Sequence, residues 1–239
     1  MQIKRQKGGD VMLLIKNKNL RSFIVKAFPF VLIPSAAILG AVAFDNSRHL
    51  IISLAIAVMT LLVFAAGYEK KKVGTWRMVI ASVMIALCVF GRFIPLFKPI
   101  TAITIITGMY IGSETGFLVG AMSALISNIY MGQGPWTAFQ MLAWGLIGYI
   151  AGMAAEPLKR HRFLLLAYGV VTGIAYSFIM DIWTTLWYSN GFDLGVYLSA
   201  LVTAIPYTVS YAVSNFIFLL FLAKPFGEKL ERIRKKYGI

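Results

Sequence analysis

Residues 115–155 consist of TGFLVGAMSALISNIY, then MGQGPW, then TAFQMLAWGLIGYIAGMAA, so a short polar loop separates two long apolar runs. The chain around them is 59% hydrophobic and only 13% charged over its 239 residues. Hydrocarbon offers no hydrogen-bond partners, so irregular backbone at membrane depth must face water or protein. The pattern therefore predicts membrane helices, with the loop 131–136 lying as a lid over a binding site.

Apolar segments of the same kind recur along the whole chain. They occupy residues 27–44, 50–68, 77–97, 99–112, 115–130, 137–155, 163–187 and 196–223. A straight helix needs about 20 residues to cross a hydrocarbon core of about 30 Å, and the fourth and fifth segments are short for that. These two are either true spans that borrow flanking residues or one broken hairpin. The sequence predicts an all-α integral membrane protein with about eight spans.

Positive charge is unequally divided between the two sides that eight spans define. The side holding both termini takes 20 of the 23 Lys and Arg residues, and the other side keeps Arg48, Arg92 and Lys98. Because cytoplasmic loops are enriched in Lys and Arg, we predict a multi-pass protein of the cell membrane with both termini in the cytoplasm. The net charge of +14 is then a topology signal and a lipid contact, not a nucleic-acid surface.

Composition divides the chain into four predicted parts. They are a basic cytoplasmic segment (1–26), a transmembrane hairpin with a charged linker (27–75), a six-helix membrane domain (76–224) and a basic cytoplasmic tail (225–239). The basic start and Ala41-Val42-Ala43 imitate a cleaved signal peptide. The length of the basic region, Pro29 and Pro34 in the apolar run, and the span that follows at once argue against cleavage.

Small residues recur at intervals of four along the predicted helices. One row holds Gly112, Gly116, Gly120 and Ala124, and a second holds Gly148 and Gly152. This spacing lets helix backbones approach closely, so it predicts tight packing inside the bundle. Ser82 and Ala86 have the same spacing on segment 77–97, where they either pack internally or present a groove to another membrane protein.

Polar and aromatic side chains gather near the predicted outer ends of the spans. The candidates for contact with a solute are Arg92, Lys98, Asn128, Gln133, Trp136, Gln140, Trp144, Asp181, Tyr207 and Tyr211. Polar groups within spans tend to face the bundle interior, because exposure to lipid costs free energy. Asp181 either pairs with Arg92 or Lys98 or accepts hydrogen bonds from a ligand. An interfacial aromatic belt is the alternative for Trp136, and bridging of two helices is the alternative for the amides.

Patterns typical of catalysis and nucleotide binding are missing from the sequence. It contains no HExxH, GxSxG or GxxxxGK[ST] motif. His49 and His161 are predicted on opposite sides of the membrane, and Cys88 is the single cysteine, which excludes a disulfide framework. We therefore expect no enzyme activity, no ATP hydrolysis, no metal site and no cofactor.

From about Trp76 to the C terminus the chain resembles the substrate-binding S component of an energy-coupling factor (ECF) vitamin transporter, in particular the cobalamin-type subgroup. The resemblance is carried by Gly91-Arg92, Phe97 to Ala102, Gly116 to Ala121 with Ser123, Ser127 and Asn128, and Gly132 to Thr137 with Phe139-Gln140-Met141. It implies a six-helix bundle that holds its solute beneath the loops around residues 92–99, 131–136 and 188–197. The N-terminal hairpin is an addition to that plan.

The resemblance also implies a mechanism and partners. The chain would capture a vitamin outside, with cobalamin favoured, and dock on the transmembrane T component through Ser82 and Ala86. Family members carry Ala-x-x-x-Ala at that patch, whereas this chain has serine at the first position. Two ATPase subunits would then drive a tilt of the bundle. The alternatives are an S component for another vitamin, an autonomous transporter that is proton-coupled through Asp181, and a scaffold without a solute.

Overall fold

The computed structural model describes residues 17–43, 49–70, 75–134, 136–189 and 192–237, and regular structure in these ranges is entirely helical. The elements are α1 (Lys18–Ala27), η1 (Phe28–Leu32), α2 (Ile33–Ala43), α3 (His49–Lys70), α4 (Thr75–Gly91), α5 (Ile100–Ile111), α6 (Ser113–Met131), α7 (Trp136–Met153), α8 (Ala155–Arg160), α9 (Arg162–Tyr188) and α10 (Leu194–Tyr237). Predictions about most of the basic segment 1–26, the loop 44–48, the linker 71–74 and Pro135 lie outside the described residues. The all-helical fold class is confirmed.

The helices follow the predicted apolar segments closely. Among the described residues, three helices are long and apolar enough to cross a membrane, namely Asn19–Leu39, Arg162–Tyr188 and Leu194–Tyr237. Three shorter apolar helices occupy Leu54–Val63, Trp76–Gly91 and Ile100–Ile111. The protein is thus a helical membrane protein, while the count of eight crossings stays a prediction.

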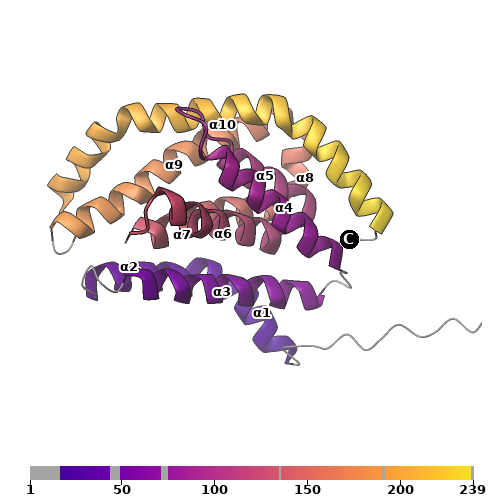
Figure 1. Cartoon of the computed structure of the whole chain (residues 1–239), viewed down its shortest axis with the longest axis horizontal. Coiled ribbons are helices and arrows are strands. Elements are labelled where there is room, and N and C mark those ends of the chain that lie inside the picture. The colour runs from indigo at the N-terminus through magenta and orange to yellow at the C-terminus, as the bar shows by residue number, and fades with distance from the viewer. Residues whose placement is uncertain (1–16, 44–48, 71–74, 135, 190–191, 238–239) are drawn as a thin grey trace, which may run out of the picture.

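Three layers of helices make up the molecule in Figure 1. The hairpin of α2 and α3 forms one layer, α6 and α7 form the middle, and α4, α5, α9 and α10 lie on the other side. Helix α5 has 12 residues, nearly all buried, and rises only about 18 Å. Its side chains are surrounded by other helices and not by lipid. Its length therefore does not have to match the thickness of the bilayer. α5 and α6 are two separate helices that meet at Gly112, where a φ of 126° favours glycine.

Close contact between α6 and α7 confirms the predicted role of the glycine rows. A Cβ added to Gly116 would collide with the backbone carbonyl of Gly148, and one added to Gly120 would collide with the carbonyl of Trp144. Gly152 meets the backbone of Ser113 in the same way. Since lipid supplies little hydrophobic drive between helices, such backbone contact is what holds the middle layer together.

The N-terminal helices α1 to α3 are attached to this middle layer by specific contacts. The hydroxyl of Tyr149 on α7 donates to the carbonyl of Val25, 2.7 Å away. The ring of Phe30 meets the Tyr149 ring edge to face at 5.4 Å. Pro29 lies at the start of the π-helical turn η1, where the missing proline N–H interrupts the regular ladder. The hairpin therefore covers part of α6 and α7 that would otherwise meet lipid.

A buried ion pair joins the starts of α4 and α6. The fully buried Arg77 lies 3.2 Å from the Glu114 carboxylate and donates to Thr115 Oγ1 at 2.6 Å. Removing one partner of such a pair leaves a buried charge uncompensated, which makes the pair a strong constraint on geometry. It fixes the predicted cytoplasmic ends of two helices whose other ends approach the polar loop.

Helix α10 continues through the predicted boundary at residues 224 and 225. Its 44 residues correspond to about 66 Å of helix, and it arches over the bundle in Figure 1. Beyond Lys224 it is anchored by Gly227 against the Tyr110 ring and by stacking of Tyr237 on Trp76, with centroids 3.9 Å apart. The basic C-terminal segment is thus a packed arm of α10, although it contains Pro225.

Candidate functional site

Arg92 is the hub of a buried polar network just beyond the end of α4. Gly91 lies so close to the Pro99 ring that a Cβ there would collide, and this contact folds the connecting loop back onto the bundle. The Arg92 side chain is therefore directed inward, with only 8% of the residue exposed. Its Nη1 donates to Ser127 Oγ and, over 2.7 Å, to Asn128 Oδ1 on α6.

The amide of Asn128 connects this hub to α7. Its Nδ2 donates to Thr137 Oγ1 at 2.9 Å and to Gln140 Oε1 at 2.8 Å. Thr137 Oγ1 in turn donates to Gln133 Oε1, while Gln133 Nε2 donates to the Leu125 carbonyl. The polar loop 131–136 is thus joined to the Asn128 amide network through Gln133 and Thr137, while its role as a lid stays a prediction.

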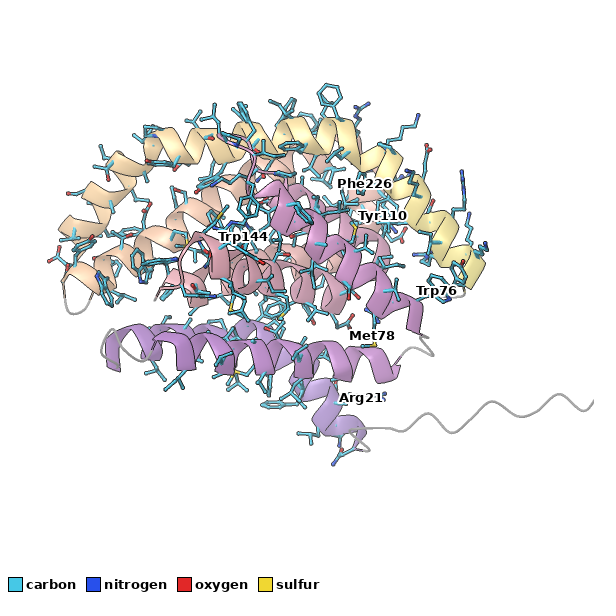
Figure 2. The ribbon with its side chains drawn as sticks, in the orientation of Figure 1. Arg21, Trp76, Met78, Tyr110, Trp144 and Phe226 are labelled. Carbon is cyan, nitrogen blue, oxygen red and sulfur yellow. The ribbon has the colours of Figure 1, made fainter. Side chains whose placement is uncertain are left out.

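An aromatic stack lies beneath the guanidinium. Arg92 is 5.1 Å from the centroid of the Trp144 ring, a cation–π distance. Trp144 points into the bundle in Figure 2 and stacks on Tyr176 with centroids 4.7 Å apart and 16° between planes. Tyr176 meets Tyr211 edge to face at 5.0 Å, and Trp144 Nε1 donates to Thr101 Oγ1 at 3.1 Å. Tyr176 was not predicted, because a single aromatic residue in an apolar span has the same pattern as a core residue.

Trp136 and Lys98 lie at the edge of this network. Trp136 packs on Trp183 of α9 at 5.7 Å, which continues to Trp187 at 6.3 Å. The backbone of Lys98 is fixed to α10, since Ser214 Oγ donates to its carbonyl at 3.0 Å. Burial and, second, the positive charge of Arg92 lower the pKa of Lys98. A ligand with negative or acceptor groups would stabilise the charged form of this lysine.

Asp181 is a buried acid whose hydrogen bonding is incomplete. Its Oδ2 has no hydrogen-bond partner within the described ranges, and no ion pair joins it there to Arg92 or Lys98. The residue is only 7% exposed. Since buried polar groups are nearly always satisfied, an orphan acceptor of this kind indicates a place for a donor from a ligand or a water. The alternative of an ion pair with either cation is not seen.

Tyr207 lies apart from the other candidates. It is 67% exposed, whereas Tyr211 and Asn215 face the bundle and Asn215 Nδ2 donates to the Gly169 carbonyl. Tyr207, Tyr211 and Asn215 recur every four residues on α10. Four residues turn an α-helix by about 400°, so each of these side chains is rotated by about 40° from the next. Tyr207 is two steps from Asn215 and therefore lies off the inward face, and the hydroxyl of the adjacent Thr208 donates to Ser177 Oγ at 2.7 Å instead.

The predicted partner patch lies on the surface. Ser82 and Ala86 are both exposed on α4, and Ser82 Oγ is satisfied by the Met78 carbonyl at 3.0 Å. Together with Ile85, Val89, Phe90, Phe93, Ile126 and Tyr130 they line an apolar groove of about 600 Å³ between α4 and α6. Of the two interpretations of this spacing, the presented groove agrees with the structure and internal packing does not.

The arrangement can bind and orient a solute but carries no reactive set. It offers a guanidinium, amide donors and acceptors, a carboxylate and stacked rings, held by the α4–α5 loop and by α6, α7, α9 and α10. No group of three or more His, Cys, Asp or Glu residues able to hold a metal occurs in the part of the chain that the structure describes. These are the residue types from which solute sites in membrane proteins are built.

The family follows from comparison with known proteins. The model of the ECF-type riboflavin transporter S component matches residues 72–232, about two thirds of the chain, and the chain belongs to this family. Its members are substrate-binding subunits, not enzymes, and work with a T component and ATPases. No curated protein and no solved structure matches the chain. The N-terminal hairpin lies outside the matched residues. The family model names riboflavin, and it lends no support to the cobalamin-type subgroup.

Proposed function

We propose that this chain captures a water-soluble vitamin at the outer end of residues 76–224, in a multi-pass bundle with both termini in the cytoplasm. One observation carries the proposal: Asn128 and Trp144 both contact Arg92. Asn128 also bonds Gln140, and Trp144 stacks on Tyr176, so polar and aromatic groups of the α4–α5 loop and of α6, α7 and α9 meet at one place. Membership of the S-component family supports the same role. Arg92 Nη1, Asn128 and Gln140 are bonded to one another, whereas Arg92 Nε has no hydrogen-bond partner among the described residues. A ligand would exchange its own hydrogen bonds for some of the former and could accept from the latter.

A flat heteroaromatic vitamin is the substrate class we favour, with riboflavin first, because the matching family model names it. Trp144 and Tyr176 already stack on each other to within 16°, so a planar ring of the ligand would have to extend this stack at its edge or enter it. The orphan Oδ2 of Asp181 is suited to a hydroxyl or N–H donor. Cobalamin, the preference from the sequence alone, is bulky and needs a wide cavity. It remains the competing ligand in the test.

Binding to the purified protein in detergent and in nanodiscs tests this function. We expect saturable binding of riboflavin by calorimetry or fluorescence quenching, with cobalamin and thiamine as comparison ligands. Gln140→Ala and Asp181→Asn each remove one hydrogen-bonding group, at a cost of about 1–3 kcal/mol. We therefore expect the affinity for the vitamin to weaken by at least roughly fivefold in each variant.

Tyr207→Ala is the matched control, because Tyr207 has the same chemistry as Tyr211 but lies exposed off the network. Its affinity should equal that of the parent protein, whereas Tyr211→Ala should bind more weakly. Failure of riboflavin, cobalamin and the other common water-soluble vitamins to bind would refute the proposal. Uptake driven by a proton gradient into proteoliposomes holding this chain alone would instead establish the autonomous transporter.

The second part of the proposal places the T component in the groove at Ser82 and Ala86. Ala86→Leu places a bulky side chain in the groove of about 600 Å³ and keeps helix backbones from approaching closely. We expect at least a tenfold loss of co-purified T component and ATPases from cells expressing all subunits. Val83→Leu, which enlarges a neighbouring exposed residue outside the groove, should change nothing. Unchanged recovery of partners with Ala86→Leu would move the interface elsewhere.

A further inference from the structure

A second cavity lies at the opposite end of the bundle from Arg92. Its volume is about 230 Å³, and it is enclosed by the end of α5, the junction of α8 and α9, and the C-terminal arm of α10. Tyr110 lines this cavity and lies close to Phe226 of that arm in Figure 2. Ligand pockets for drug-sized molecules are usually 300–1,000 Å³. This cavity is suited to a small polar group, not to a whole vitamin.

The lining changes character in a fixed order along α10. Leu219, Leu220 and Ala223 come first, Lys224 follows, and Glu228 and Glu231 come last. Leu220, Lys224, Glu228 and Glu231 repeat at helical intervals, so they share one face over about 16 Å. The opposite wall, formed by α8 and α9, also changes from apolar to cationic, with Leu165 first, then Arg162 and Lys159. The cavity therefore has an apolar floor, a cationic middle and a carboxylate rim.

The charged groups of this cavity are held in place without pairing directly with one another. Lys159 Nζ lies 4.7 Å from the Tyr110 ring centroid, and Arg162 Nη2 donates to the Leu220 carbonyl at 3.0 Å. Within the described ranges, no ion pair joins Lys159, Arg162 or Lys224 to Glu228 or Glu231. Burial and the positive charge of Arg234 lower the pKa of Lys159. A bound anion at this position would stabilise the charged form of the lysine.

We propose that this cavity binds the headgroup of a zwitterionic aminophospholipid, phosphatidylethanolamine being the type. The phosphate is held by Lys159, Arg162 and Lys224, and the ammonium donates to Glu228 and Glu231. The glycerol and first acyl carbons lie over Leu165 and Leu219. The order from apolar to cationic to carboxylate matches the order of acyl chain, phosphate and ammonium in such a lipid. A purely anionic headgroup would leave the two carboxylates facing its charge.

The test is native mass spectrometry of the delipidated full-length protein, titrated with phosphatidylethanolamine, phosphatidylcholine and phosphatidylglycerol of identical acyl chains. We expect phosphatidylethanolamine to bind at least roughly fivefold more tightly than phosphatidylcholine, whose quaternary ammonium cannot donate hydrogen bonds to a carboxylate. It should also exceed phosphatidylglycerol. Equal binding of all three lipids, or a preference for phosphatidylglycerol, would overturn the proposal.

Two conservative variants separate the two halves of the headgroup. Lys159→Gln should weaken phosphatidylethanolamine and phosphatidylglycerol alike, because both carry the phosphate. Glu231→Gln should weaken phosphatidylethanolamine by about fivefold, the effect of one hydrogen bond, and leave or strengthen phosphatidylglycerol. A Glu231→Gln variant that keeps the full preference for phosphatidylethanolamine would refute the ammonium site.

The matched control is a charged residue at the same end that does not line the cavity. Lys229→Gln alters an exposed lysine of α10 and should bind lipid as the parent does. Thermal midpoints of all three variants show that they are folded. Inorganic phosphate forms the last arm. Millimolar binding of inorganic phosphate, with displacement of the lipid, would identify a site for a free phosphate and exclude the lipid assignment.

Discussion

Gly148→Ala should lower the thermal stability of the protein strongly. The new Cβ would meet the Gly116 backbone on α6 and the Thr104 side chain on α5. Backbone cannot rotate away as a side chain does, so we expect the upper end of the cost of overpacking, about 3 kcal/mol or more. For a chain of this size, that corresponds to a fall in the melting temperature of roughly 6–12 °C.

The measurement is thermal unfolding of the detergent-solubilised protein, with the recovery of monodisperse protein as a second readout. Gly195→Ala is the control, because Gly195 lies in the exposed first turn of α10 and a Cβ there meets only the Asp193 carboxylate, at 3.2 Å. That variant should match the parent protein. Equal melting temperatures for Gly148→Ala and the parent would mean that α5, α6 and α7 do not make the backbone contact described.

Arg92→Gln should have the largest effect on vitamin binding. The change removes a buried cation that donates to Ser127 and Asn128 and lies over the Trp144 ring. Hydrogen bonds from charged groups contribute about 1.5–3 kcal/mol, so the affinity should fall by roughly 10- to 150-fold. Calorimetry with riboflavin, or with the vitamin that co-purifies, measures the change directly.

Two further variants make the Arg92 result specific. Arg92→Lys keeps the charge but loses the planar guanidinium, so it should bind with intermediate affinity. Arg160→Gln, at an exposed position at the end of α8, should bind as the parent protein does. If Arg92→Gln binds the vitamin normally while its melting temperature falls, the network around Arg92 only stabilises the fold and the solute binds elsewhere.

Local patterns in the sequence were sufficient to predict much of the scaffold. The apolar runs on either side of the loop 131–136 became α6 and α7, and the glycine rows led by Gly116 and Gly148 face each other across them. Both signals depend only on neighbours three or four residues apart, which a helix places on one face. The S-component family is confirmed for the same reason, because its motifs are contiguous.

Contacts between distant segments were harder to predict. Tyr207 and Tyr211 were both predicted to contact a solute, but four residues turn a helix by about 400°, and Tyr207 is exposed. Tyr176 joined the aromatic stack although no local signal distinguished it from a core residue. Of the two alternatives for Asp181, the ion pair with Arg92 or Lys98 is not seen among the described residues, where Arg92 donates to Ser127 and Asn128 of α6 instead.

The amino-acid sequence by itself determined that this protein is a helical membrane bundle of the S-component family, because hydropathy, charge asymmetry and contiguous motifs are local properties. Only the tertiary structure decided which polar side chains share a site. Asn128 and Gln140 are 12 residues apart and Arg92 and Asn128 are 36 apart, yet each pair lies within 3 Å. Such distances depend on how α4, α6 and α7 pack, and packing is a property of the whole bundle.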